Sequence, residues 1–379
     1  MIEIIDHIDG VRQLAPEWNR LASRFESPLV QHEWYLSCAE AFCPPDTLRV
    51  VVLRTNGTVR AIAPLAVVGH GVHKRLELLG TGVLCEPCSF LYEDQNALVE
   101  IVSAIQEFNE PTFLKRLISL SNESDIIADQ WKSAHWILTK TSTASPWLPI
   151  VSSWEDFEKT ISSHQRYTLR RARKRAEEIG PLEFSLLSPD EYSINQCLEE
   201  LFRIEASGWK GRAGTSLQMN DQLRKFFRFY SFALAQQNKL RFGLLRIGDR
   251  AVAAQLAVEF AGRYWVLKIG FDEEFARCSP GILLMHESVR YAFEKELQAF
   301  EFLGSNEPWL RMWTDQVHQF ATYRSYPVTL QGIAGFSSDS SGFLWKKFEQ
   351  LNKKSLPTQL HSPRHATNIA SPSTIHPVS

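Results

Sequence analysis

The chain has 379 residues, of which 44% are hydrophobic and 22% are charged, and its formal net charge is −2. This composition excludes a mainly disordered chain, a collagen-like fibre and a highly charged tail protein. A net charge so close to zero gives no global field that would recruit nucleic acid, and we expect no DNA partner. The length predicts two domains.

The sequence also lacks the features of a membrane or secreted protein. No run reaches the roughly 18 apolar residues that cross a bilayer, and residues 1–6 do not begin a signal peptide. The six cysteines are scattered and do not form a disulfide framework. We therefore expect a cytoplasmic protein with no transmembrane segment. Peripheral membrane contact and the oligomeric state stay open.

Residues 1–150 are predicted to mix helices with short strands. Apolar residues at helical spacing predict helices over 14–25 and 32–42. The β-branched runs 48–53 and 59–68 flank Asn56-Gly57, which indicates a hairpin, and Pro64 assigns its second strand to an edge or a bulge. Further short strands are expected near 76–79, 114–120 and 135–138, and a helix over 95–108.

A second half is predicted to follow the prolines Pro146 and Pro149, which mark a composition break. Its expected elements are a helix over 163–179, a strand over 182–187, helices over 191–207 and 222–236, strands over 240–247, 251–260 and 263–271, a helix over 281–296 and a strand over 300–303. We predict an α/β (α+β) fold whose mixed sheets are flanked by helices. Its parts are 1–150, 151–335, and a terminal helix with a disordered tail over 336–379.

The segment 264–289 carries the most information, because it predicts a strand, a short loop and an amphipathic helix. The N–H groups and the positive dipole end at such a helix N-terminus suit a pyrophosphate. Gly281 allows the backbone close to the phosphates, and Pro280 fixes the helix entry. An ordinary strand–helix crossover with a glycine at its turn is the alternative.

The order of these elements resembles a GNAT acyltransferase core. The chain resembles the GNAT-like CelD-type proteins linked to polysaccharide biosynthesis and, more distantly, the Fem-type peptidoglycan aminoacyltransferases. The resemblance runs from about residue 21 to 326. Its carriers are residues 28–34, 61–65, 79–80, 166–175, 205–211, 268–272, 280–281 and 303–309.

This resemblance implies tandem GNAT-like halves, with acyl-coenzyme A as the co-substrate in the second half. The implied reaction moves an acyl group to an amine or hydroxyl of a sugar, lipid or peptide precursor in envelope or polysaccharide biosynthesis. The implied cofactor-binding residues are Arg277, Cys278, Ser279, Gly281 and Ile282. A Fem-like aminoacyltransferase that uses aminoacyl-tRNA and a non-catalytic GNAT scaffold are the alternatives.

Two departures from the family pattern affect these expectations. The phosphate signature of the family is Arg or Gln, two residues, Gly, one residue, then Gly or Ala. Pro280 and Ile282 stand at its two glycine positions. Relatives often carry a lysine where this chain has Leu310, so any role of that lysine is either lost here or shifted to Arg311.

Three charged residues are the candidate catalytic groups. Glu205 is the candidate general base for the acceptor. Lys268 and Asp272 lie on and just beyond the strand before the loop, where GNAT proteins open their active cleft. Strand alternation assigns Lys268 to the same face as Val266 and Gly270. The alternatives for Lys268 are a solvated strand residue or a structural ion pair with a carboxylate such as Glu205 or Asp272.

The candidate acceptor-binding residues are Arg166, Arg170, Trp209, Lys210, Glu307 and Trp309. Arg166 and Arg170 belong to a basic helical stripe that suits a phosphate-rich ligand, such as a nucleotide-linked sugar or an RNA acceptor stem. A solvated helix face is the alternative for that stripe. The other four lie in segments that carry the family resemblance.

Two pairs of residues have the composition of a zinc site. They are His70 with His73 and Cys85 with Cys88. The resemblance implies no metal, and incidental exposed histidines and thiols are the other interpretation. We expect no metal ion.

Overall fold

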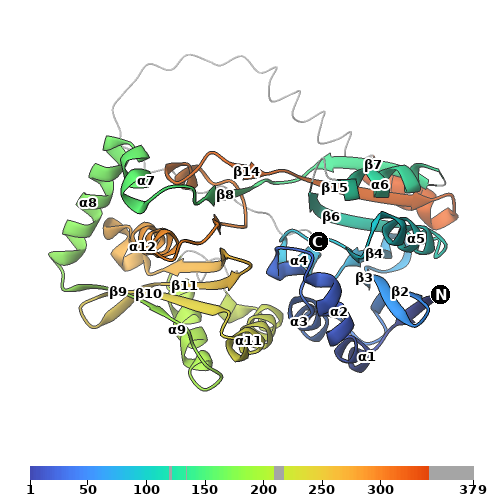
Figure 1. Cartoon of the computed structure of the whole chain (residues 1–379), viewed down its shortest axis with the longest axis horizontal. Helices are drawn as coiled ribbons and strands as arrows, with labels where there is room; N and C mark the ends of the chain where they lie inside the picture. The colour runs from blue at the N-terminus through green and yellow to red at the C-terminus, as the bar shows by residue number, and fades with distance from the viewer. Residues whose placement is uncertain (119–121, 134, 209–216, 341–379) are drawn as a thin grey trace, which may run out of the picture. The chain divides into compact units, whose positions relative to one another are not determined.

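The computed structural model describes residues 1–118, 122–133, 135–208 and 217–340. Residues 1–335 form one compact unit, and residues 336–379 belong to a second. The helix predicted near 343–351 and the tail predicted beyond residue 355 lie outside the described residues. The first unit contains two mixed β-sheets with helices on their faces (Figure 1).

The first sheet is antiparallel except at one strand pair. Its strands are, in spatial order, β1 (Ile2–Ile5), β2 (Leu48–Thr55), β3 (Thr58–Val68), β4 (Arg75–Leu78), β6 (Thr112–Ile118), β15 (Phe320–Pro327) and β7 (His135–Thr141), with β5 (Leu91–Tyr92) paired to β3. The strands β4 and β6 are the parallel pair. Its helices are α1 (Ile8–Gln13), α2 (Ala15–Ala22), α3 (His32–Phe42), α4 (Thr81–Leu84), α5 (Gln95–Gln106) and α6 (Asn122–Lys132), with 3₁₀ turns η1 (Pro28–Val30) and η2 (Gly71–His73).

The second sheet repeats this pattern. Its strands are, in spatial order, β9 (Leu182–Leu187), β10 (Leu240–Ile247), β11 (Arg250–Phe260), β12 (Arg263–Phe271), β13 (Ala299–Glu301), β8 (Ser145–Pro149) and β14 (Val317–His318). The strands β12 and β13 are the parallel pair. Its helices are α7 (Trp154–Thr160), α8 (Ser163–Glu177), α9 (Ile194–Ala206), α11 (Asp221–Gln236) and α12 (Pro280–Glu294), with 3₁₀ turns η3 (Leu217–Met219), η4 (Glu273–Cys278) and η5 (Pro308–Met312).

The two sheets share one order of connections. Each has four antiparallel strands in sequence, then a parallel strand reached through a helix, then two antiparallel strands. Two strands pair in the sheet of the other half of the sequence, across the boundary predicted near residue 150. β8 precedes it and pairs in the second sheet, whereas β15, from the C-terminal part, pairs between β6 and β7 in the first (Figure 1). The mixed α/β architecture with two sheets is confirmed, and the predicted boundary stays a prediction.

The hairpin of β2 and β3 forms at the predicted turn. Asn56 and Gly57 both have positive φ values, 50° and 80°, as a two-residue hairpin turn requires. The prediction for Pro64 is wrong, because β3 is an interior strand with no bulge at that residue. The carbonyl of Pro64 accepts from the Leu79 N–H, just beyond the end of β4. The missing N–H would face the same partner, Leu79, which lies just past the end of β4, so the proline affects only the end of this ladder.

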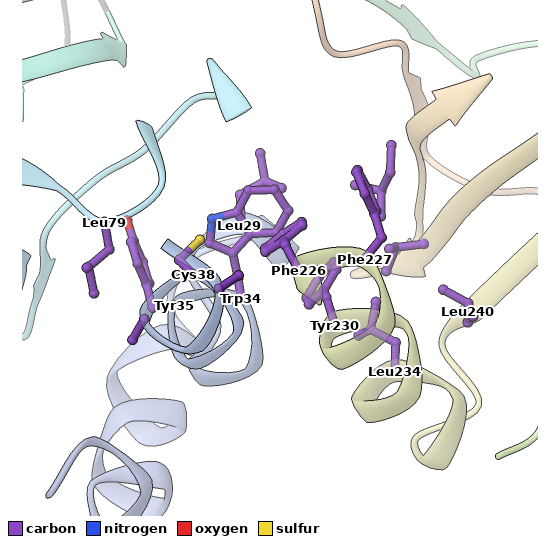
Figure 2. Packing of buried hydrophobic residues seen from close by; sticks show 14 of the residues in the cluster. Leu29, Trp34, Tyr35, Cys38, Leu79, Phe226, Phe227, Tyr230, Leu234 and Leu240 are labelled. Carbon is purple, nitrogen blue, oxygen red and sulfur yellow. The ribbon is translucent and has the colours of Figure 1, made fainter. Parts of the chain in front are cut away.

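One hydrophobic core joins helices from both parts of the sequence. Trp34 of α3 packs edge-on against Phe226 and Tyr230 of α11, with ring centroids 5.0 Å apart in each pair (Figure 2). Trp34 is 4% exposed, and the two rings on α11 are fully buried. Residues from positions near 30 and near 230 therefore stabilise the same core. None of the described helices combines the length and the apolarity that a membrane span needs.

Candidate active site

The parallel strands β12 and β13 separate partway along β12. Their pairing begins at Arg263 with Ala299 and ends at Trp265 with Glu301, whereas β12 continues to Phe271. A β-bulge accompanies the separation, because Lys268 pairs with Leu256 while Val266 pairs with the next residue of β11. The remaining length of β12 therefore borders an opening in the sheet rather than a neighbouring strand.

The bulge changes which face Lys268 occupies. Val266 and Ile269 pack into the core beneath α12. The Lys268 Nζ lies 5.6 Å above the Phe227 ring of α11, on the opposite face. The predicted common face for Lys268 and Val266 is wrong, because the extra residue of the bulge shifts the alternation by one. Lys268 thus faces the α9 and α11 side.

Asp272 anchors the loop that follows β12. Its side chain is fully buried, and Arg250 Nη2 donates to Oδ2 at 2.6 Å. Its Oδ1 accepts from the Glu274 N–H at 3.1 Å, which caps η4. Both carboxylate oxygens are therefore engaged in holding the loop in place.

The helix α12 begins with an unusual cap. Its N-cap residue, Ser279, is left-handed with φ 47°, and Pro280 is its first residue. The N–H groups of Ile282 and Leu283 both bond to the Ser279 carbonyl, at 3.0 and 3.1 Å. Within the part of the chain that the structure describes, the Gly281 N–H has no hydrogen-bond partner. The Gly281 N–H is therefore a main-chain donor at the positive end of α12, a 15-residue helix.

Substitution of Gly281 is limited by packing rather than by its φ angle. A Cβ atom there would lie 3.2 Å from Cδ1 of Phe271, which is tighter than ordinary contact. The left-handed conformation falls instead on Ser279. The Phe271 ring is 39% exposed, so it has room to move.

Two adjoining pockets lie at this helix start. The larger, of about 310 Å³, is mostly apolar and is lined by Ile269, Phe271, Ala276, Ser279, Gly281, Ile282 and Trp309. The smaller, of about 220 Å³, shares Ser279, Ile282 and Trp309 with it and extends to α8 and η5. Four of the predicted site residues therefore meet here, namely Ser279, Gly281, Ile282 and Trp309.

The predicted basic stripe on α8 does not reach these pockets. The Arg166 Nη1 donates to the carbonyls of Glu158, Lys159 and Ile161, at 3.2, 3.0 and 2.8 Å, and so caps the end of α7. Arg170 is exposed, and helical geometry places it opposite Ala172, which lines the smaller pocket.

Another arginine of α8 lies nearer the pockets. Arg175 is one turn beyond Ala172, and its Nη1 donates to the Arg277 carbonyl at 3.1 Å. Arg175 is therefore the α8 cation beside the loop. Arg175 belongs to the segment 166–175 that carries the family resemblance, but its spacing along α8 did not indicate a contact with this loop.

The other predicted residues have different environments. Glu205 is 6% exposed, and its Oε2 accepts from the Leu217 N–H at 2.8 Å. A Cβ on Gly270 would lie 3.1 Å from the Glu205 Cα, so Glu205 is on the Lys268 side of β12. Arg277 and Glu307 are exposed, and Cys278 is buried in the core under η4. Trp209 and Lys210 lie outside the described residues.

A carboxylate that the sequence did not single out as catalytic lies beside the opening. Glu86 follows α4 of the first sheet, and its Oε2 accepts from the Gly304 N–H at 3.3 Å, just past β13. Arg116 Nη1 is 3.7 Å from the same oxygen. Burial raises the pKa of Glu86 to about 7, although the cations Arg116 and Lys268 oppose the rise. No sequence pattern marks Glu86 beyond its place between Cys85 and Cys88.

The zinc alternative gains no support from the geometry. Cys88 is buried, and its Sγ donates to the Lys115 carbonyl at 2.8 Å, whereas Cys85 is exposed. Across residues 1–118, 122–133, 135–208 and 217–340, no three His, Cys, Asp or Glu side chains converge on a site that could hold a metal ion.

A segment in the second half of the chain matches a known protein family. Residues 163–311 match the family described as Acetyltransferase (GNAT) domain. These residues have the GNAT-type fold. The match contains β9 to β13, both pockets and the start of α12. The GNAT part of the predicted resemblance is thus confirmed for this segment, and the CelD type stays a prediction. Curated proteins include no match to the chain.

Solved structures share the fold over most of the chain. A C-terminal DUF2156 domain from Agrobacterium fabrum has a TM-score of 0.55 at 10% identity, covering 87% of this chain and 96% of that one. FemX has a TM-score of 0.55 at 12% identity, covering 86% and 97%. A protein of unknown function from Bacteroides thetaiotaomicron has a TM-score of 0.54 at 10% identity, covering 86% and 99%. At such identities the likeness shows the fold alone, and the predicted α/β class with two GNAT-like sheets is confirmed.

Proposed function

We propose that the chain is an acyltransferase that moves an acyl group from acyl-coenzyme A to an amine or hydroxyl of a sugar, lipid or peptide precursor, in envelope or polysaccharide biosynthesis. One observation carries the proposal. A mostly apolar pocket of about 310 Å³ adjoins both the free edge of β12 and the N-terminus of α12, within the segment that matches the GNAT family.

The pocket walls suit the parts of coenzyme A. The Gly281 N–H and the positive end of α12 would bind the pyrophosphate. Arg175 and Arg277 flank that end and would add positive charge, whose effect salt in the solvent partly screens. The apolar residues Ile269 and Trp309 would contact the pantetheine arm. Because Pro280 has no N–H and Ile282 bonds to Ser279, this loop would rely on fewer donors than the usual signature.

The opening beside β12 supports direct transfer of the acyl group from the thioester to the acceptor. Main-chain N–H groups at an unpaired strand edge can polarise the thioester carbonyl, and such fixed donors stabilise the developing oxyanion. Lys268 and Glu205 lie on the opposite face of β12 from the pocket. The acceptor would approach from their side and attack the thioester through the opening.

Isothermal titration with acetyl-coenzyme A tests this proposal. Wild type should bind, and Gly281→Val should weaken binding at least tenfold, about 1.4 kcal/mol, because a branched side chain would occupy the space the phosphates need. Gly281→Ala adds the same Cβ contact with Phe271 without the branch, so it should lose less. Thermal midpoints of all three proteins would check folding.

Two results would contradict parts of the proposal. If wild type shows no binding at millimolar acetyl-coenzyme A, the acyl-coenzyme A assignment is wrong. Binding of aminoacyl-tRNA by the same protein would then favour the Fem-like alternative, and binding of neither would favour a scaffold. If Gly281→Val binds as tightly as wild type, the pyrophosphate is not at this helix.

A further inference from the structure

Glu86 lies in the first half of the chain, but its carboxylate contacts the chain beside the opening in the second sheet. It belongs to the segment between β4 and α5, which occupies the same place in the first sheet as η4 occupies in the second. Its carboxylate accepts the Gly304 N–H at 3.3 Å. Gly304 lies three residues beyond the end of β13, and its φ of 54° turns the chain there.

The carboxylate hydrogen-bonds to one side of the opening and is influenced by a charge on the other. On one side is Gly304, in the chain that leaves β13. On the other side is Lys268 of β12, whose charge acts on the Glu86 carboxylate. Lys268 lies three residues past Trp265, where the pairing of β12 with β13 stops. Glu86 therefore lies next to the chain that leaves β13, and it is not among the residues that line the pocket containing Ile269.

Glu86 is not held by a tight ion pair. Arg116 donates to Ser145 Oγ at 2.5 Å, to the Gly304 carbonyl at 3.0 Å and to the Cys85 carbonyl. Its 3.7 Å separation from Glu86 is longer than a hydrogen bond. Among the residues that the structure describes, the hydrogen bond to the Glu86 carboxylate comes from the Gly304 N–H. Most of its capacity to accept protons and hydrogen bonds is therefore left for a ligand.

The environment of Glu86 suits proton transfer near neutral pH. Its side chain is 17% exposed. Burial raises its pKa to about 7, and the charged groups that face it, Arg116 on β6 and Lys268 on β12, are cations that offset part of that rise. A base whose pKa lies near the working pH is the most effective proton acceptor.

We propose that Glu86 is the general base that takes a proton from the acceptor amine or hydroxyl, an inference that rests on the proposed acyltransferase function. The acceptor nitrogen or oxygen forms a bond to the acyl carbon while its proton passes to the Glu86 carboxylate. The carbon–sulfur bond then breaks, and the thiolate of coenzyme A leaves and takes up a proton. The first half of the chain thus supplies a catalytic residue for chemistry in the second.

The test compares Glu86→Gln with wild type in thiol release from acetyl-coenzyme A, with glucosamine as the probe acceptor and water alone as background. We expect the turnover rate of Glu86→Gln to fall about 100-fold or more. The dissociation constant for acetyl-coenzyme A should stay within twofold, because Glu86 lines neither of the two pockets at the start of α12. The wild-type rate should rise with pH through about 7, since only the ionised carboxylate accepts a proton. The variant should lack that rise, and the ratio of the two rates cancels the titration of glucosamine itself.

Glu123→Gln is the matched control. Glu123 is also a carboxylate of the first sheet region whose pKa burial raises to about 7, and it accepts from Ser89 Oγ at 2.8 Å and from the Phe90 N–H at 3.3 Å. Its variant should keep the wild-type rate and pH profile.

Three outcomes would overturn the role of Glu86. They are an unchanged rate in Glu86→Gln, an equal loss in Glu123→Gln, and wild-type protein that binds acetyl-coenzyme A but releases no thiol. Failure of wild type to bind acetyl-coenzyme A would instead contradict the proposed function itself.

Discussion

Arg166 and Arg170 lie one turn apart on α8 but have different partners. The Arg166 guanidinium donates to three carbonyls at the end of α7, where the helix dipole is negative. Arg170 is exposed on the side of α8 away from the pockets. We therefore assign Arg166 to the stability of the α7–α8 connection, and Arg170 to neither stability nor the cofactor pocket.

Alanine substitution separates these roles. Arg166→Ala should lower the free energy of unfolding by about 1 kcal/mol, because three carbonyls at the end of α7 lose a charged donor. Arg170→Ala should change it by less than about 0.5 kcal/mol. Neither should alter the dissociation constant for acetyl-coenzyme A. Urea denaturation and isothermal titration measure both effects. Weaker binding in Arg170→Ala together with unchanged stability in Arg166→Ala would show that the basic stripe contacts a ligand.

Individual site residues were predictable where their role depends on neighbours in sequence. Ser279, Gly281 and Ile282 border the pocket because they form the start of one helix. Asp272 was a candidate catalytic group, but its charge is taken up by Arg250, 22 residues away. Glu86 meets Gly304 across 218 residues, and no local pattern carries that contact.

At the scale of elements, β15 links the end of the chain to its beginning. It pairs with β6 on one side and β7 on the other, so it completes the first sheet from beyond residue 319. Tyr323 of β15 is 7% exposed and belongs to the core beneath α5 and α6. The stability of the first sheet thus depends on a C-terminal strand.

Tyr323→Ala tests that dependence. Removing a buried aromatic ring should lower the free energy of unfolding by about 2–4 kcal/mol. Hydrogen exchange should accelerate in β6 and β7, whose ladders β15 holds. Thr322→Ala, which removes a methyl group and a hydroxyl that lies 2.6 Å from Ser142 Oγ, should cost less than about 1 kcal/mol. Faster exchange confined to the second sheet would refute the link.

Elements with strong local signals were predicted well. The strand over 182–187 and the hairpin of β10 with β11 fall where alternation and turn residues placed them. β8 and β15 were not predicted. β8 contains Pro146 and Pro149, which indicate a linker in isolation. Both strands form only because partners distant in sequence pair with them, and hydrophobic pattern alone does not reveal such pairing.

At the scale of the whole unit, side chains from both halves of the sequence contact one another. Trp34 and Phe226 share a core, and the Glu86 carboxylate of the first half accepts from the Gly304 N–H of the second. The second half contains the pocket and the helix start to which we propose that coenzyme A binds. If Glu86 is the general base that we propose, the first half contributes a catalytic residue to that site.

A crystal structure with bound coenzyme A tests the central claim most directly. The account predicts a pyrophosphate oxygen within hydrogen-bond distance of the Gly281 N–H and the thiol end between β12 and β13, with the pantetheine arm against Ile269 and Trp309. Coenzyme A bound at the first sheet, or a pocket left empty at saturating ligand, would contradict it.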